Sequence, residues 1–116
     1  MTLFHITTRT AWERARELGS YRPQTFAADG FIHLSEERQW LATANRFYRG
    51  QRDLVLVALH EDWLAAEVRR EPADGDLFPH LYGALNLDAV AAVYDLPLDD
   101  AGSVLAPREL TPSSAT

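Results

Sequence analysis

The sequence contains no cysteine, which excludes disulfide bonds and zinc sites built on cysteine. It has no apolar run close to the roughly 20 residues that a membrane-spanning helix needs. The first residues show no charged, apolar and cleavable segments in series, as a secretory leader would. A basic patch for nucleic acid is also missing, because the arginines are scattered and the net charge is -6. We therefore expect a cytoplasmic protein that binds neither membranes nor nucleic acid.

The composition is that of an ordinary globular domain. Hydrophobic residues make up 47% of the 116 residues and charged residues 24%, which suffices for one buried core. We expect a single folded domain over residues 1–98. From Asp99 onward the chain is rich in aspartate, glycine, serine, proline and threonine. This composition predicts a weakly ordered tail over residues 99–116.

The first part of the chain predicts a strand followed by a helix. Residues 3–7 have the alternation of a strand. Thr10 and Glu13 have the spacing of a capping box, which predicts the start of a helix. Gly19 would end that helix in a left-handed conformation, and a loop is expected over residues 21–30.

The stretch from Gly30 to Ser35 is predicted to be a short buried strand that runs directly into a helix. Ser35 is a favourable N-cap, and the two glutamates after it would lie where the helix dipole favours negative charge. This arrangement would place His33 beside the positive end of the helix, which disfavours protonation of its imidazole. The helix carries an aromatic and apolar stripe that is expected to pack in the core, and it ends at Gly50.

The second half of the chain is predicted to be mostly β-structure. The continuous apolar run at 53–59 predicts a central strand buried on both faces. Residues 67–71 and 90–96 predict two further strands. We interpret residues 77–83 as a loop rich in aromatic and imidazole groups, and residues 87–88 as one helical turn. The order of elements indicates the α+β class, with a split or mixed β-sheet and two packed helices.

Three histidines have distinctive positions: His5 on the first strand, His33 at the end of the second, and His80 in the aromatic loop. If the first two strands are neighbours, these imidazoles meet in one cleft. Its donors, acceptors and flat rings would suit an uncharged polar ring with a ribose, or a small carbonyl compound. The candidates for its remaining walls are Tyr21, Glu71 and Tyr82.

Such a cleft is compatible with three kinds of chemistry. In glycosidic cleavage of a nucleotide, histidines would bind ribose hydroxyls and Glu71 would stabilise an oxocarbenium-like transition state. A three-histidine metal site would need ligands from distant segments without an HxH or HExxH cue, so we predict no metal. In the third case the histidines only orient a bound ligand. A serine-histidine-acid triad is not predicted, because Ser35 is better explained as a helix cap.

Several short motifs stand out along the chain. They are Phe4-His5, Gly30-Phe31-Ile32-His33-Leu34-Ser35, Ala44-Asn45-Arg46-Phe47, Arg49-Gly50, Leu54-Val55-Leu56-Val57, Glu71 and Phe78-Pro79-His80-Leu81-Tyr82-Gly83. Together they resemble a bacterial family of small proteins, domain of unknown function 952, over roughly residues 2 to 98. The last motif is the most specific. No reaction is established for that family.

A more distant resemblance carries an implication for function. The order His5-Ile6-Thr7, a helix, Ile32-His33-Leu34-Ser35, a helix and an apolar strand is similar to the NAD-binding core of ADP-ribosyltransferases. The closest likeness is to the catalytic half of RNA 2′-phosphotransferases, whose His-Gly-Thr and His-Leu-Ser strands hold nicotinamide and its ribose. The resemblance implies an ADP-ribosyltransferase-like fold.

The chain departs from that pattern at Ile6, which stands where the transferases have glycine. The basic N-terminal half that binds RNA is missing, so RNA phosphate transfer is not expected. Glu71 is chosen as the catalytic carboxylate on chemical grounds, since no motif identifies it.

The leading hypothesis is NAD-dependent ADP-ribosyl or glycosyl transfer, with NAD or a related nucleotide as substrate. The predicted catalytic residues are His33, Glu71 and His5. The alternative is a non-catalytic small-molecule binding or accessory module on the same fold. The sequence does not determine the oligomeric state. The predicted ligand-binding residues are Thr7, Tyr21, Ser35, His80 and Tyr82.

Overall fold

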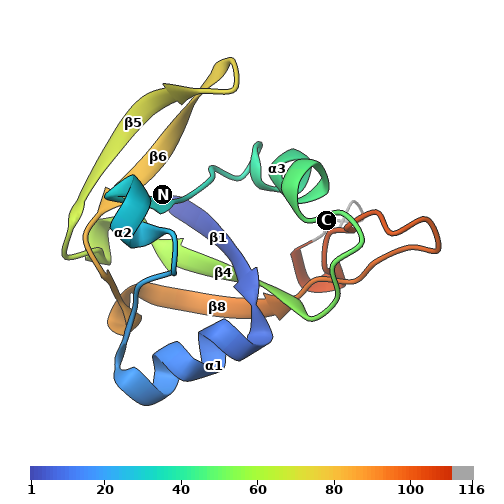
Figure 1. Ribbon diagram of the computed structural model, residues 1–116, viewed down its shortest axis with the longest axis horizontal. Coiled ribbons are helices and arrows are strands. Elements are labelled where there is room, and N and C mark those ends of the chain that lie inside the picture. The colour runs from blue at the N-terminus through green and yellow to red at the C-terminus, as the bar shows by residue number, and fades with distance from the viewer. Residues whose placement is uncertain (111–116) are drawn as a thin grey trace, which may run out of the picture.

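The computed structural model describes residues 1–110, which fold as an α+β domain with three groups of antiparallel strands (Figure 1). The groups have the strand orders β1-β4-β8, β2-β7 and β3-β6-β5. The strands are β1 Thr2–Thr8, β2 Ser20–Tyr21, β3 Ile32–His33, β4 Leu54–His60, β5 Glu67–Ala73, β6 Asp76–Tyr82, β7 Leu85–Asn86 and β8 Val90–Asp95. The helices are α1 Arg9–Leu18, α2 Phe26–Asp29 and α3 Trp40–Phe47, with 3₁₀ turns η1 Glu61–Trp63, η2 Leu87–Ala89 and η3 Arg108–Leu110.

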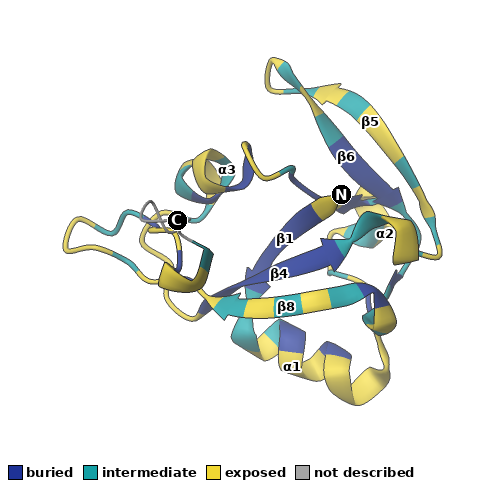
Figure 2. Cartoon of the chain, turned by 180° about the vertical axis from the view of Figure 1, so that it is seen from behind, coloured by how far each residue is buried: buried dark blue, intermediate teal, exposed yellow. Residues whose placement is uncertain are grey.

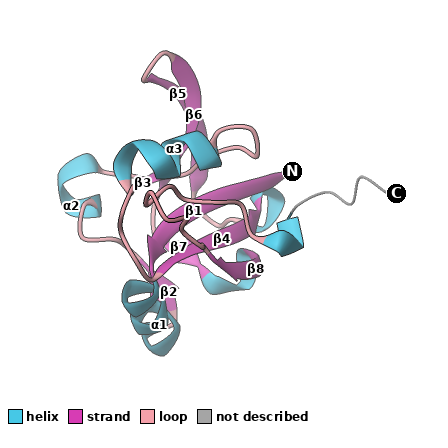
Figure 3. Ribbon diagram, turned by 90° about the vertical axis from the view of Figure 1, so that its right-hand side faces the viewer, coloured by secondary structure: helices cyan, strands magenta, loops and turns pink. Residues whose placement is uncertain are grey.

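Strand β4 is the centre of the core, as its apolar run predicts. It lies between β1 and β8, and every residue before His60 is buried (Figure 2). Its buried odd-numbered residues join a cluster that includes Trp12 of α1, and its even-numbered residues join a second cluster that includes Trp40 of α3. The two helices therefore cover opposite faces of the β1-β4 sheet (Figure 3).

Ser35 is part of a strand bridge, so its predicted role as a helix cap is wrong. Its backbone pairs with that of Phe4, each N–H donating to the other residue's C=O at 2.8 Å. Helix α3 begins only at Trp40. The residues between form a turn, in which the Gln39 side chain accepts a hydrogen bond from the N–H of Glu36. His33 consequently does not lie at the start of a helix.

The segment predicted as an aromatic loop is the strand β6, which forms a hairpin with β5. Asp74 and Gly75 connect the two strands with φ values of 51° and 80°, the positive pair that a tight two-residue hairpin turn requires. The tip contacts α3, where Asp74 Oδ1 lies 3.2 Å from Arg46 Nη2. As in any strand, alternate residues share a face, and one face of β6 carries Phe78, His80 and Tyr82.

The described chain continues to pack beyond residue 98, where the sequence predicted a tail. Val104 is buried in the cluster that includes Trp40. The side chain of Asn45 holds it by accepting from the Val104 N–H at 2.7 Å and donating to its C=O at 3.0 Å. The folded unit therefore includes part of the segment after Asp99. Residues 111–116 of the predicted tail lie outside the described residues.

None of the helices found between residues 1 and 110 is both long and apolar enough to cross a membrane. The cytoplasmic location remains a prediction.

Helix α1 begins one residue after Thr8 rather than at the predicted cap, Thr10. The hydroxyl of Thr8 accepts a hydrogen bond from the N–H of Ala11 at 3.1 Å. The end of the helix is as predicted, since Gly19 has a φ of 85°. The capping box was misplaced because threonines at both positions have a suitable side chain, and only strand β1 determines where the helix starts.

The position of this cap can be tested by two matched substitutions. Thr8→Ala removes the acceptor for the Ala11 N–H and is expected to lower the free energy of unfolding by about 1 kcal/mol. Thr10→Ala, on the exposed side of the helix, is expected to leave it nearly unchanged. Urea unfolding measures both, and an equal loss in the two variants would contradict the observed cap.

Candidate functional site

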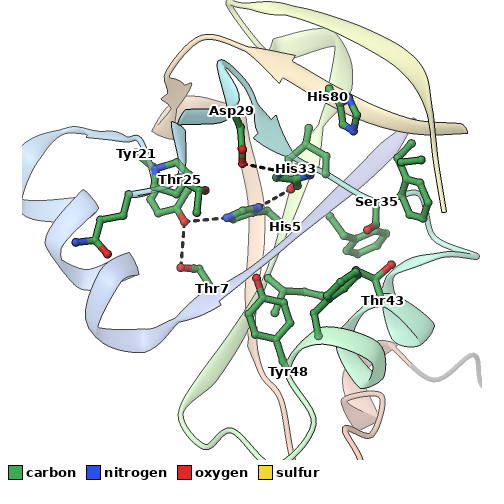
Figure 4. A pocket seen from close by; sticks show the side chains of 18 of the residues that line it. His5, Thr7, Tyr21, Thr25, Asp29, His33, Ser35, Thr43, Tyr48 and His80 are labelled. Carbon is green, nitrogen blue, oxygen red and sulfur yellow. Dashed lines mark hydrogen bonds and ion pairs between the residues drawn. The ribbon is translucent and has the colours of Figure 1, made fainter. Parts of the chain in front are cut away.

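A cleft of about 490 Å³ brings the three predicted histidines together. It lies between β1, β3, the turn of the β5-β6 hairpin and α3, and Figure 4 shows it from close by. Three further predicted residues, Thr7, Tyr21 and Ser35, also line it. Glu71 and Tyr82 do not. The geometric expectation behind the site, convergence of imidazoles that lie far apart in the sequence, is met.

His5 anchors one wall of the cleft. It lies on β1 and is only 7% exposed. Its Nδ1 is 2.8 Å from the C=O of His33, which can only accept, so Nδ1 carries a proton. Burial lowers the pKa of His5 to about 4, so at neutral pH the ring is uncharged and Nε2 has no proton.

The hydrogen bonds of Tyr21 follow from this tautomer. Its hydroxyl is 2.8 Å from Nε2 of His5 and 3.0 Å from Oγ1 of Thr7. A phenol has one proton, and the unprotonated Nε2 must receive it. Thr7 then donates to the tyrosine oxygen, which completes an ordered chain from the His33 carbonyl to Thr7. Burial raises the pKa of Tyr21 to about 12, which keeps this hydroxyl protonated.

His33 lies on the more open side of the cleft. Its Nε2 is 3.0 Å from Oδ2 of Asp29 at the end of α2, and its side chain is 60% exposed. Gly30 has a φ of 79°, a left-handed conformation that glycine adopts without steric cost. This turn returns the chain so that Asp29 and His33 face each other.

His80 combines burial with a carboxylate partner. Its Nδ1 donates to Oε1 of Glu71 at 2.8 Å, and the hydroxyl of Tyr82 donates to the same oxygen. These two hydrogen bonds hold the pKa of Glu71 below its ordinary value. The ring of Phe31 stacks on the imidazole, with centroids 4.0 Å apart and planes inclined by 20°. Glu71 thus does not line the cleft itself, and its contact with the cleft is the hydrogen bond that it accepts from His80.

The cleft also has residues that the sequence reasoning did not select. The stripe of α3 predicted to pack in the core is divided, because Trp40 and Ala44 are buried whereas Phe47 lines the cleft. Tyr48 does both, since it packs against the cluster that includes Trp40 and also lines the cleft. Phe78 belongs to the aromatic segment singled out in the sequence, but the side to which its ring points follows only from the strand conformation of β6. No sequence signal pointed to Asp29. The cleft-lining residues missed in this way include Asp29, Thr43, Phe47, Tyr48, Asp74 and Phe78.

Several polar groups of the cleft are free to bind a ligand. Within residues 1–110, the hydroxyls of Ser35, Thr43 and Tyr48 and Nε2 of His80 have no hydrogen-bond partner in the structure. None of them is fully enclosed, since every enclosed polar side-chain atom in this part of the chain is paired. Each belongs to a residue that lines the cleft, where it can contact a bound molecule.

The backbone of β1 adds a second kind of free group. Phe4 directs its N–H and C=O to Ser35, and because a strand alternates with period two, Ile6 directs its own N–H and C=O to the same edge. Among the described residues no bridge to this edge follows that of Ser35. The edge of Ile6 therefore offers one donor and one acceptor to the cleft, which Ile6 lines.

The alternative of a three-histidine metal site does not fit this geometry. Metal binding requires a free ring nitrogen on each ligand, whereas both nitrogens of His5 are engaged by His33 and Tyr21. In the part of the chain that the structure describes, no group of three or more histidine or acidic side chains is placed to hold a metal ion.

The chain belongs to a family of proteins of unknown function, DUF952, whose model matches residues 6–93. The crystal structure of protein CC0527 from Caulobacter crescentus is similar, with 36% sequence identity, a TM-score of 0.84, and coverage of 90% of this chain and 94% of that one. Its solution NMR structure has 37% identity, a TM-score of 0.77, and coverage of 92% and 91%. None of the curated proteins matches this sequence significantly.

The buried, neutral state of His5 can be tested through the pH dependence of stability. Because burial lowers its pKa from 6.5 to about 4, the unfolded chain takes up a proton at higher pH than the folded protein. The stabilisation is complete above pH 6.5 and is lost as the pH falls from 6.5 towards 4, by up to about 1.4 kcal/mol per pH unit.

Urea unfolding between pH 7.5 and 5 measures this slope. His5→Gln is expected to have a shallower slope than the wild type, because the titrating ring is gone. His60→Gln controls for the loss of a histidine outside the cleft, since that ring lies against Trp63. An unchanged slope in His5→Gln would refute the assignment.

Proposed function

We propose that the cleft binds the nicotinamide-ribose end of NAD, or of a related nucleotide, and that the protein transfers an ADP-ribosyl or glycosyl group from it. The observation that carries this proposal is the free backbone edge at Ile6. A primary carboxamide such as that of nicotinamide has one oxygen acceptor and an amino donor. These groups are complementary to the N–H and C=O of a strand edge.

The resemblance to ADP-ribosyltransferases supports the same ligand. The two segments that carry it, His5-Ile6-Thr7 and His33-Leu34-Ser35, flank the cleft and meet at the bridge between Phe4 and Ser35. The side chain of Ile6 replaces a glycine of those enzymes. It packs in the cluster with Phe4 and Trp40, so the substitution leaves the backbone edge open.

The charges around the cleft favour one end of NAD over the other. The lining residues include the carboxylates of Asp29 and Asp74 but no lysine or arginine. Asp74 is paired with Arg46, so an anionic diphosphate inside would meet the negative charge of Asp29 with no lysine or arginine in the lining to offset it, which is unfavourable. The nicotinamide ring of NAD is cationic and would be attracted. We therefore place the diphosphate outside the cleft.

One observation favours the non-catalytic alternative. Glu71 was predicted to stabilise positive charge on the reacting sugar, but it lies behind His80 and does not line the cleft. Without such a carboxylate at the sugar, the cleft would bind the nucleotide and leave the glycosidic bond intact. Nicotinamide release from NAD, followed by chromatography, distinguishes the two functions.

Recognition of the carboxamide predicts a preference between two otherwise matched ligands. NAD is expected to bind about 10- to 100-fold more tightly than nicotinic acid adenine dinucleotide, in which a carboxylate replaces the amide. The carboxylate cannot donate to the C=O of Ile6 and is repelled by Asp29. Isothermal titration calorimetry measures both affinities. Equal affinities, or no binding at millimolar NAD, would refute the proposal.

A further inference from the structure

The three imidazoles of the cleft differ in what they can do with a proton. Both ring nitrogens of His5 are occupied by His33 and Tyr21, so this ring has no site left for a proton from a ligand. His33 has a free Nδ1, but its side chain is 60% exposed; its hydrogen bond to Asp29 is exposed, and its ring meets those of Phe31 and His80 only edge-on. Neither ring is both available and fixed.

His80 has both properties. Its Nδ1–H is directed at Glu71, so Nε2 is the nitrogen that carries no proton in the neutral ring, and it has no hydrogen-bond partner among residues 1–110. The ring is 5% exposed and is held by stacking on Phe31. A buried base with one fixed tautomer needs little reorganisation when it accepts a proton.

Tyr82 and Arg69 hold Glu71, the hydrogen-bond partner of His80, in place. The Tyr82 hydroxyl donates to the same oxygen of Glu71 that His80 uses, which fixes that carboxylate. The guanidinium carbon of Arg69 lies 4.4 Å from the centroid of the Tyr82 ring. Positive charge that develops on His80 would therefore face an oriented carboxylate.

We propose that His80 is the proton acceptor of the cleft, that Glu71 is its positioning residue, and that the group acceptor is consequently water or an alcohol. This inference rests on the proposed function and deepens it, because it names the chemical class of the acceptor. It also reverses two roles expected from the sequence, in which Glu71 faced the sugar and His80 only bound the ligand.

The reaction step balances without a further reactant. The oxygen of the acceptor forms a bond to C1′ of the ribose, and the bond between C1′ and the nicotinamide nitrogen breaks. The electron pair of the broken bond stays on that nitrogen and neutralises the pyridinium, so nicotinamide leaves without taking a proton. The proton of the acceptor hydroxyl moves to Nε2 of His80, and Glu71 stabilises the resulting imidazolium.

The tautomer of His80 is testable without any ligand. NMR of the protein labelled with ¹⁵N is expected to show His80 protonated at Nδ1 and unprotonated at Nε2 while the ring is neutral. Glu71→Ala should move the proton to Nε2, and Glu17→Ala, on the exposed face of α1, should not. A wild-type ring protonated at Nε2 would overturn the inference whatever the ligand.

Single-turnover release of nicotinamide from NAD tests the role in catalysis. His80→Gln and Glu71→Ala are expected to slow release by about 100-fold while the Kd for NAD changes little, and Glu17→Ala should react as the wild type does. Release from His80→Gln at the wild-type rate overturns the role of His80 and leaves the proposed function standing. Wild-type protein that binds NAD without releasing nicotinamide also overturns the role of His80, and with it the transfer reaction. Wild-type protein that does not bind NAD refutes the proposed function, and this inference with it.

Discussion

The pair of backbone hydrogen bonds between Phe4 and Ser35 sets the geometry of the whole cleft. It joins the β1-β4-β8 sheet to the segment that follows β3. It is the one bridge recorded between these two segments within residues 1–110, so the chains diverge beyond it and the cleft opens there. The same bridge brings the carbonyl of His33 within 2.8 Å of His5 and determines that Ile6 presents its backbone to the open side.

Burial of His5 is tolerated because the fold satisfies both of its nitrogens. A polar ring without partners in this position would cost several kcal/mol, and a charged one would cost more. The depressed pKa of His5 is therefore the consequence of a structural role. His5, Tyr21 and Thr7 form one hydrogen-bonded wall of the cleft (Figure 4), and the proton transfer that we propose is assigned to His80 instead.

The sequence was informative where a local rule decides the structure. The apolar run of β4 and the left-handed Gly19 depend on neighbouring residues, and both were predicted. The failures involve partners distant in sequence. Ser35 has the chemistry of a helix cap, but its backbone pairs with that of Phe4, a residue far from it in the sequence. The role of Glu71 depends on which face of the β5-β6 hairpin its side chain shares with His80. Because residues 77–83 were predicted to be a loop, the strand alternation that directs His80 into the cleft was not recognised.

The proposed binding and proton-transfer groups belong to different sheets, and this division explains how a small domain can preorganise them. The Ile6 edge belongs to β1, and His80 belongs to β6. Between them, β3 pairs with β6 through His33 and His80 and continues to the bridge at Ser35. The distance from the edge to the imidazole is thus set by backbone hydrogen bonds rather than by flexible side chains. A ligand held at the edge would meet an acceptor activated by His80 in a fixed geometry, which is the condition under which positioning lowers a reaction barrier most.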